Sequence, residues 1–323
     1  MIRLLRANFS RMFRSWYFRL GMLISIVLNI YVPVVNYINM QTHSDWYNLE
    51  DSDPEAQMEF LRSINCHESY MFIGGMFCMF IVPVIIALFI GTDYSDGTIR
   101  NKLMVGHRRC DIYLANLITA VSSAELVLLS GMAVSYLTGL IFFKYTYLSA
   151  VEILVFILVG IFITASISAI CTFLAMIIPS KAGGMTASIM TSFVLMISGG
   201  SIGSALESPR YYDDGVYEHT DTGEIYELDN SPDEMSPKEL HEYGLTTSDI
   251  DKLEPMQTEN PYYPKGLKRK IYVWIQEATP GCQYMSLQSW DKDFNDTSVE
   301  WSAFFIVVTT AAGILMFRKR NLK

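Results

Sequence analysis

Long apolar stretches dominate the pattern along this chain. A helix needs about 20 mostly apolar residues to cross the ~30 Å hydrocarbon core of a bilayer. A soluble helical bundle would instead need a polar stripe along each helix, and Met71–Ile90 contains no charged residue. The pattern therefore predicts an all-α polytopic membrane protein with six transmembrane helices. The predicted helices are Tyr17–Ile38, Tyr70–Ile90, Leu114–Phe143, Val151–Ile178, Gly184–Ala205 and Val299–Phe317.

The polar segments between these stretches indicate how the rest of the chain is organised. Between helices five and six, Tyr217–Leu228 alternates as in a β-hairpin, and Pro237 to Gly244 has the start and stop residues of a short helix. Lys268–Ala278 has the pattern of an amphipathic helix. We therefore expect a small α+β domain there. The expected segments are an amphipathic elbow helix at 1–16, helices one to five at 17–205 with a polar loop at 91–111, an extracytoplasmic domain at 206–298, helix six at 299–317 and a basic tail at 318–323.

The distribution of charge predicts the orientation. Only 18% of the residues are charged and the net charge is −9, but the basic residues are concentrated in short connecting segments. Cytoplasmic loops of membrane proteins carry an excess of lysine and arginine. We therefore expect both termini in the cytoplasm, the acidic segment 206–298 outside, and the cell membrane as the location. The basic residues on the expected cytoplasmic side are Arg3, Arg6, Arg11, Arg14, Arg19, Arg100, Lys102, Arg108, Arg109, Lys181, Arg318, Lys319, Arg320 and Lys323.

Two of these basic segments have more structure than a topology signal needs. In the elbow, apolar residues from Leu5 to Trp16 recur at helical spacing between arginines, which is typical of a helix lying on the inner leaflet. In the loop, Asp96-Gly97 predicts a turn and Thr98 a helix cap. Ile99 and Leu103 fall on one face of the helix that follows, with Arg100 and Lys102 elsewhere, and Gly106 is expected to end it.

The loop also carries a resemblance to a known family. Its Asp-Gly-Thr-Ile-Arg turn at 96–100, the following Leu103 and the Gly-x-x-Arg at 106–109 are similar to those of ATP-binding-cassette (ABC) exporter permeases of the type-2 class from Gram-positive bacteria. The elbow, the six-helix layout, the basic stretch at 268–272 and the basic ending resemble the same family. In that family this short segment is the coupling helix, which contacts an ATPase subunit. The residues to which the resemblance gives this role are Asp96, Gly97, Thr98, Ile99, Arg100, Lys102, Leu103, Gly106 and Arg109.

The resemblance implies that transport and ATP hydrolysis are carried out by different chains. This chain has no Gly-x4-Gly-Lys-Ser/Thr loop, so we expect no nucleotide site and no enzymatic activity of its own. ATP and Mg²⁺ would bind to the ATPase subunits. The other expected partners are a second permease subunit, identical or different, and the lipid bilayer, with no nucleic acid. The substrate would be exported and is left open between a peptide, a lipid and a drug.

Three polar or reactive residues stand outside this scheme. Glu125 lies within helix three, where an ionised group is costly. It would mark a substrate path or the ion site of a secondary transporter, or it would be a carboxyl group hydrogen-bonded at a helix interface. Cys66 and Cys282 are the two cysteines on the expected outer side, so they form either a disulfide or two thiols. A membrane sensor with an outer binding domain is a further alternative, and the spacing of cysteines and histidines predicts no metal site.

Overall fold

The computed structural model describes residues 1–42, 66–68, 70–71, 73–143, 145–146, 148–178, 180–228, 235, 237–247, 249–288 and 295–319. The chain divides into two compact units. The helical unit comprises Met1–Gly203 and Val273–Lys323, and the second unit comprises Ser204–Tyr272. Of the predicted basic tail, residues 320–323 lie outside the described residues.

Six helices are long and apolar enough to cross a membrane, which confirms the six-helix prediction. Each coincides with one predicted stretch but extends past it at one or both ends, because polar residues continue a helix beyond the apolar run. The second helix runs on through Gly91 to Ser95, so the connecting segment is shorter than the predicted loop at 91–111. The helices are α2 (Trp16–Thr42), α4 (Ile73–Ser95), α6 (Arg109–Phe142), α7 (Ala150–Ile177), α8 (Lys181–Glu207) and α12 (Asn295–Lys319).

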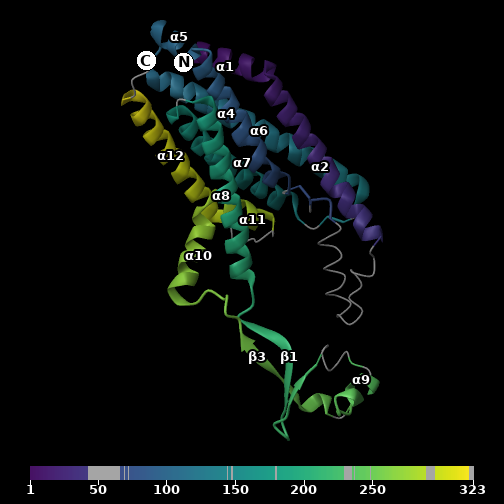
Figure 1. Cartoon of the computed structure of the whole chain (residues 1–323). Coiled ribbons are helices and arrows are strands. Elements are labelled where there is room, and N and C mark those ends of the chain that lie inside the picture. The colour runs from purple at the N-terminus through teal and green to yellow at the C-terminus, as the bar shows by residue number, and fades with distance from the viewer. Residues whose placement is uncertain are drawn as a thin grey trace. The chain divides into compact units, whose positions relative to one another are not determined.

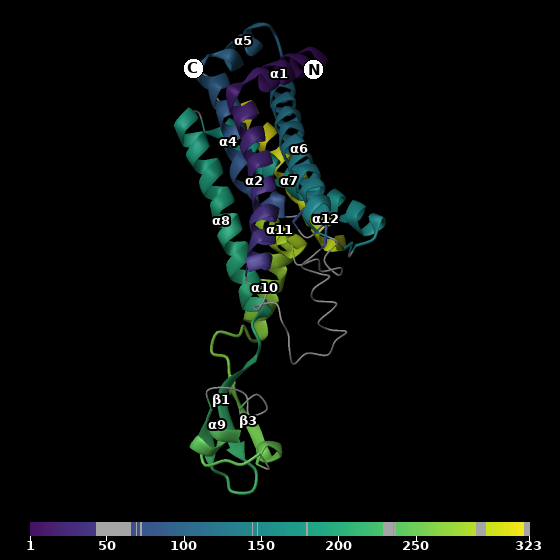
Figure 2. The same cartoon turned by 90° about the vertical axis from the view of Figure 1, so that its right-hand side faces the viewer.

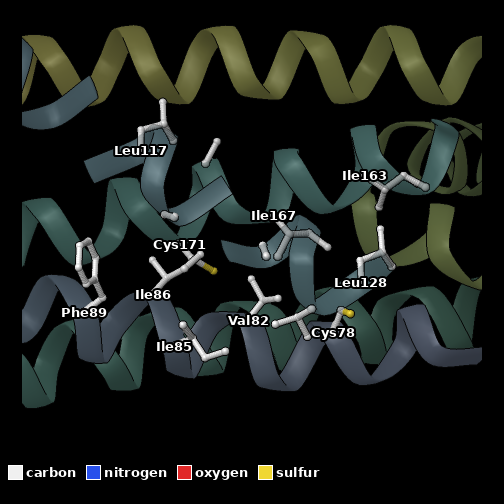
Figure 3. Close-up of a cluster of buried hydrophobic side chains, with 14 of the residues drawn as sticks. Cys78, Val82, Ile85, Ile86, Phe89, Leu117, Leu128, Ile163, Ile167 and Cys171 are labelled. Carbon is white, nitrogen blue, oxygen red and sulfur yellow. The ribbon is translucent and has the colours of Figure 1, made fainter. Parts of the chain in front are cut away.

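The core of the helical unit lies around α7, which packs against α4, α6 and α12, while α2 packs on α4 and α6 (Figures 1 and 2). Side chains from α4, α6 and α7 interdigitate in a buried apolar cluster (Figure 3). The outer surfaces of α2, α8 and α12 keep many large apolar side chains exposed, as expected for helices that face lipid. The labelled members of the cluster are Cys78, Val82, Ile85, Ile86, Phe89, Leu117, Leu128, Ile163, Ile167 and Cys171.

The elbow forms helix α1 (Ile2–Arg14), which ends where the Ser15 hydroxyl donates to the Met12 carbonyl (2.6 Å). Its protein-facing side differs from the predicted apolar face. Leu4, Asn8 and Met12 are buried, whereas Trp16, just beyond the helix, is 69% exposed. The helix therefore has two apolar surfaces, one packed on α6 and one open. A polar residue, Asn8, lies in the centre of the packed one.

The second unit contains a three-stranded antiparallel sheet in the order β2-β1-β3. Strands β1 (Tyr211–His219) and β2 (Ile225–Glu227) pair where the alternating pattern predicts a hairpin, and β3 (Leu253–Glu259) pairs with the other edge of β1. Helix α9 (Pro237–Glu242) and the 3-10 helix η3 (Ile250–Lys252) complete the unit. Leu240 and Leu253 belong to its small apolar core.

The second unit is shorter than the predicted segment 206–298. Helix α10 (Gly266–Ala278) begins in it, but residues from Val273 onward group with the helical unit. This part includes helix α11 (Pro280–Gln288), which packs against α7, α4 and α12. Its Tyr284 is buried and its hydroxyl is hydrogen-bonded to Thr164 of α7. Residues between helices five and six therefore contribute to the helical core, which hydropathy alone does not indicate.

The contact between α11 and α8 requires a glycine at position 199. A methyl group on Gly199 would lie 2.8 Å from the Gly281 carbonyl oxygen, whereas one on the adjacent Gly200 would meet nothing within 4 Å. We expect Gly199→Ala to destabilise the protein by roughly 1–3 kcal/mol through overpacking. Gly200→Ala should be neutral or stabilising by about 0.5–1 kcal/mol, because alanine is the better helix former. Thermal unfolding of the two purified variants tests this, and equal midpoints would contradict the contact.

Candidate functional site

The short helix α5 (Thr98–Met104) connects α4 to α6 at the same end of the helical unit as α1 and the last turn of α12 (Figures 1 and 2). Gly97 takes the N-cap position with φ 67°, a conformation that favours glycine, and no side chain caps the helix. The prediction that Thr98 is the cap is therefore wrong. The chain leaves the helix at Gly106, which has φ 91°, and this confirms the predicted stop.

Helix α5 has one face against the protein and one face exposed. Ile99 is 2% exposed and Leu103 packs against the same core, so the predicted apolar pair holds the helix down. Met104 and Val105 are 77% and 79% exposed, and Arg100 is exposed beside them. Two adjacent large apolar side chains with an arginine form an uncovered surface in the single chain. We call Arg100, Asn101, Met104 and Val105 the outer face of α5.

Lys102 points toward the protein and joins a buried ion cluster. Its Nζ lies 3.1 Å from a carboxylate oxygen of Asp93 in the last turn of α4, and the other oxygen of Asp93 pairs with Arg11 of α1. Lys102 also donates to the side-chain oxygen of Asn8 (3.0 Å). The Asp93 side chain is 0% exposed, Lys102 11% and Arg11 32%. We call Asn8, Arg11, Asp93 and Lys102 the ion cluster.

Hydrogen bonds extend the ion cluster into the membrane helices. Asn8 donates to the side-chain oxygen of Asn116 in α6 (2.7 Å), and Asn116 in turn contacts the sulfur of Met176 in α7 (3.5 Å). Tyr94, next to Asp93, donates to the Met176 carbonyl. One connected set of polar contacts thus links α1, α5 and the ends of α4, α6 and α7.

Burial sets the electrostatics of the ion cluster. Removal from water, followed by the nearby charge of Arg11, lowers the pKa of Lys102 to about 7. Burial also lowers the pKa of Arg11 from its ordinary value. Both effects disfavour the charged forms, and the Asp93 carboxylate between the two cations opposes them. Asp93 is therefore the residue that keeps two basic groups together in a poorly solvated place.

The remaining residues of the predicted coupling segment have different surroundings in the structure. Arg109, at the start of α6, donates to the carbonyls of Phe317 and Arg318 at the end of α12 (3.1 and 3.2 Å). Asp96 is exposed in the turn before α5. Ile99, Lys102, Leu103 and Arg109 thus contact the rest of this chain, and Arg100 lies on the outer face of α5. Sequence reasoning missed Asn8 and Asn116, whose only signal is a polar residue on an otherwise apolar helical face.

Glu125 lies in α6 with both carboxylate oxygens buried, and neither has a hydrogen-bond partner among the described residues. Of the two alternatives left open for Cys66 and Cys282, the structure does not have the disulfide: both side chains are buried and they are not bonded to each other. Cys282 lies in α11, inside the helical unit rather than in the second unit. Within the part of the chain that the structure describes, no three His, Cys, Asp or Glu side chains gather as metal ligands.

Comparisons with known proteins do not identify the family. No protein-family model matches the chain. No curated protein matches it significantly. The arguments below therefore rest on the residues and their contacts.

The ion cluster predicts how the protein responds to loss of the Asp93 charge. Asp93→Asn would leave Arg11 and Lys102 facing each other without the carboxylate that pairs with both. Removing one partner of a fully buried pair costs roughly 3–5 kcal/mol, and we expect a smaller loss here because Arg11 is partly exposed. Helix α5 should loosen, so trypsin should cut after Lys102 faster than in the wild type, and the unfolding midpoint should fall. Asp96→Asn, which alters an exposed carboxylate three residues away, is the matched control, and equal effects of the two changes would refute the assignment.

Proposed function

We propose that this chain is the membrane subunit of an ABC exporter of the type-2 permease class. The observation that supports this best is helix α5, which has an uncovered outer face and a buried face tied to the ion cluster. A segment that only connected two membrane helices would need neither. A soluble protein that binds the outer face of α5 would act on α1, α4 and α6 together, because Lys102, Asn8 and Asn116 form one chain of contacts.

The proposed mechanism is a rigid-body switch. Two permease subunits face each other, and an ATPase subunit docks on the outer face of each α5. ATP binding brings the ATPase subunits together and displaces α5. Because α5 is short and held by the ion cluster, the displacement passes to the ends of the membrane helices rather than bending the loop. The substrate, a peptide, a lipid or a drug, is then released on the outer side.

The proposal includes an orientation in the cell membrane. Helices α1 and α5 and the last turn of α12 share one end of the helical unit and carry arginines, so this end lies in the cytoplasm by the positive-inside rule. Both termini are then cytoplasmic. The second unit, inserted between α8 and α12, is the α+β extracytoplasmic domain. ATP and Mg²⁺ belong to the partner chains, so the permease itself is not an enzyme.

A second candidate function is ion-coupled transport through Glu125. The observation that favours it is a buried carboxylate without a hydrogen-bond partner among the described residues, inside a helix long enough to span the membrane. Under this alternative, transport depends on an ion gradient and is lost in Glu125→Gln. Under the exporter proposal, transport follows ATP hydrolysis by the partner and persists in Glu125→Gln after the gradient is collapsed.

The outer face of α5 should contact the ATPase directly. A photo-cross-linking residue at Met104 should capture a nucleotide-hydrolysing protein in native membranes, because this side chain is 77% exposed on that face. The same residue at Thr222, an exposed turn position of the second unit, should capture none, because that unit lies on the other side of the membrane in the proposal. Failure of Met104 to capture an ATPase, or equal capture from Thr222, would overturn the exporter assignment.

Reversing the charge of an exposed residue on the outer face of α5 distinguishes an effect on ATPase binding from an effect on stability. Arg100→Glu should reduce co-purification of the ATPase several-fold and leave the unfolding midpoint unchanged, because Arg100 is exposed and outside the ion cluster. Arg3→Glu changes the charge equally on the exposed side of α1 and is the control. Lys102 is unsuitable for this test, since reversing its charge also breaks the ion cluster. An unchanged yield of ATPase with Arg100→Glu would remove this residue from the interface.

A further inference from the structure

A basic cavity lies between the start of α6 and the end of α12. Its volume is about 520 Å³, and it is lined by Arg108, Arg109, Cys110, Ile314 and Arg318.

 A separate cavity of about 750 Å³ lies beside α1, and the carboxylate-bearing side chain of Asp96 is part of its lining. Among the described residues, the lining of the cavity between α6 and α12 has three arginines and no carboxylate, so the cavity is suited to an anion.

The three arginines of the cavity differ in the contacts that they make within the chain. Arg109 is committed to the end of α12 through its bonds to the Phe317 and Arg318 carbonyls, so it fixes one wall of the cavity. Arg108 is the N-cap residue of α6 and its side chain makes no capping bond. Among the described residues, neither Arg108 nor Arg318 makes an ion pair. Asp111 lies in the first turn of α6 but does not line the cavity. Two arginine side chains therefore have charge available for a ligand.

The position of the cavity indicates which anion reaches it. It lies at the ends of two helices that are long and apolar enough to cross a membrane, where a basic group can meet anionic lipid headgroups. Val307, Ala311, Ile314 and Arg318 follow each other at helical spacing along one side of α12, and Val307 is 66% exposed. This stripe runs from the membrane-facing surface of α12 to the cavity. An acyl chain along the stripe would place a headgroup phosphate among the arginines.

We propose that this cavity binds the phosphate of an anionic phospholipid. The proposal requires only that the six helices cross a bilayer, so it is independent of the exporter assignment. Lipid is favoured over a protein partner because the apolar stripe leading to the cavity lies on a membrane-spanning helix, whereas the outer face of α5 is not part of the lining.

Native mass spectrometry of the purified chain with phosphatidylglycerol or phosphatidylcholine tests the proposal. The cavity variant Arg108→Gln/Arg318→Gln should bind phosphatidylglycerol about 30-fold more weakly, since each basic residue at a membrane surface contributes roughly a factor of five. Arg3→Gln/Arg6→Gln removes the same charge from exposed positions of α1 outside the cavity and should bind like the wild type. Phosphatidylcholine binding should be weak in all three proteins.

Each other outcome counts against the proposal. Unchanged phosphatidylglycerol binding by the cavity variant overturns it, as does an equal loss in the control, which would show a diffuse charge effect. Displacement of the lipid by millimolar inorganic phosphate would assign the cavity to a soluble anion. Loss of a co-purifying protein with lipid binding intact would assign it to a protein partner. If the double variant does not fold, Arg318→Gln alone should weaken binding about fivefold, because the backbone contact with Arg109 is kept.

Discussion

The pairing of one buried carboxylate with two cations holds the arginine-rich end of the helical unit together. Asp93 is fully buried at the end of α4, where an unpaired charge would cost several kcal/mol. Its partners come from α1 and α5, which are short helices with little apolar area to bury. Apolar packing at Met12 and Ile99 brings these helices onto the bundle, and the ion cluster fixes their positions relative to one another.

This arrangement restricts how α5 can move. A displacement of α5 alone would separate Lys102 from both Asp93 and Asn8 and would leave buried polar groups without partners, which is expensive in a poorly solvated place. A displacement of α5 together with α1 and the end of α4 keeps these contacts. The lower-energy motion is therefore a concerted one. By the same argument, any displacement of α5 would carry α1 with it.

The sequence predicts the six membrane helices because an apolar run of sufficient length has few other stable structures. It predicts their ends poorly, since hydropathy falls at Gly91 whereas α4 continues through the polar residues to Ser95. It also predicts the buried face of α5 through Ile99 and Leu103. The inward direction of Lys102 was not predictable in the same way, because its partner Asn8 lies 94 positions away in the chain. Thr98 was a reasonable cap by residue type, but Gly97 occupies the cap position.

The arginines show why counting charges predicts topology but not function. Those at the end of the helical unit that carries α1 and α5 all contribute to the same excess of positive charge, yet the structure gives them separate roles. Arg11 neutralises a buried carboxylate, Arg109 satisfies the carbonyls at the end of α12, and Arg100 remains exposed beside two apolar side chains. An arginine already committed to a contact within the chain is a poor candidate for binding a partner. The residues left for partners are therefore those whose charge the fold has not used.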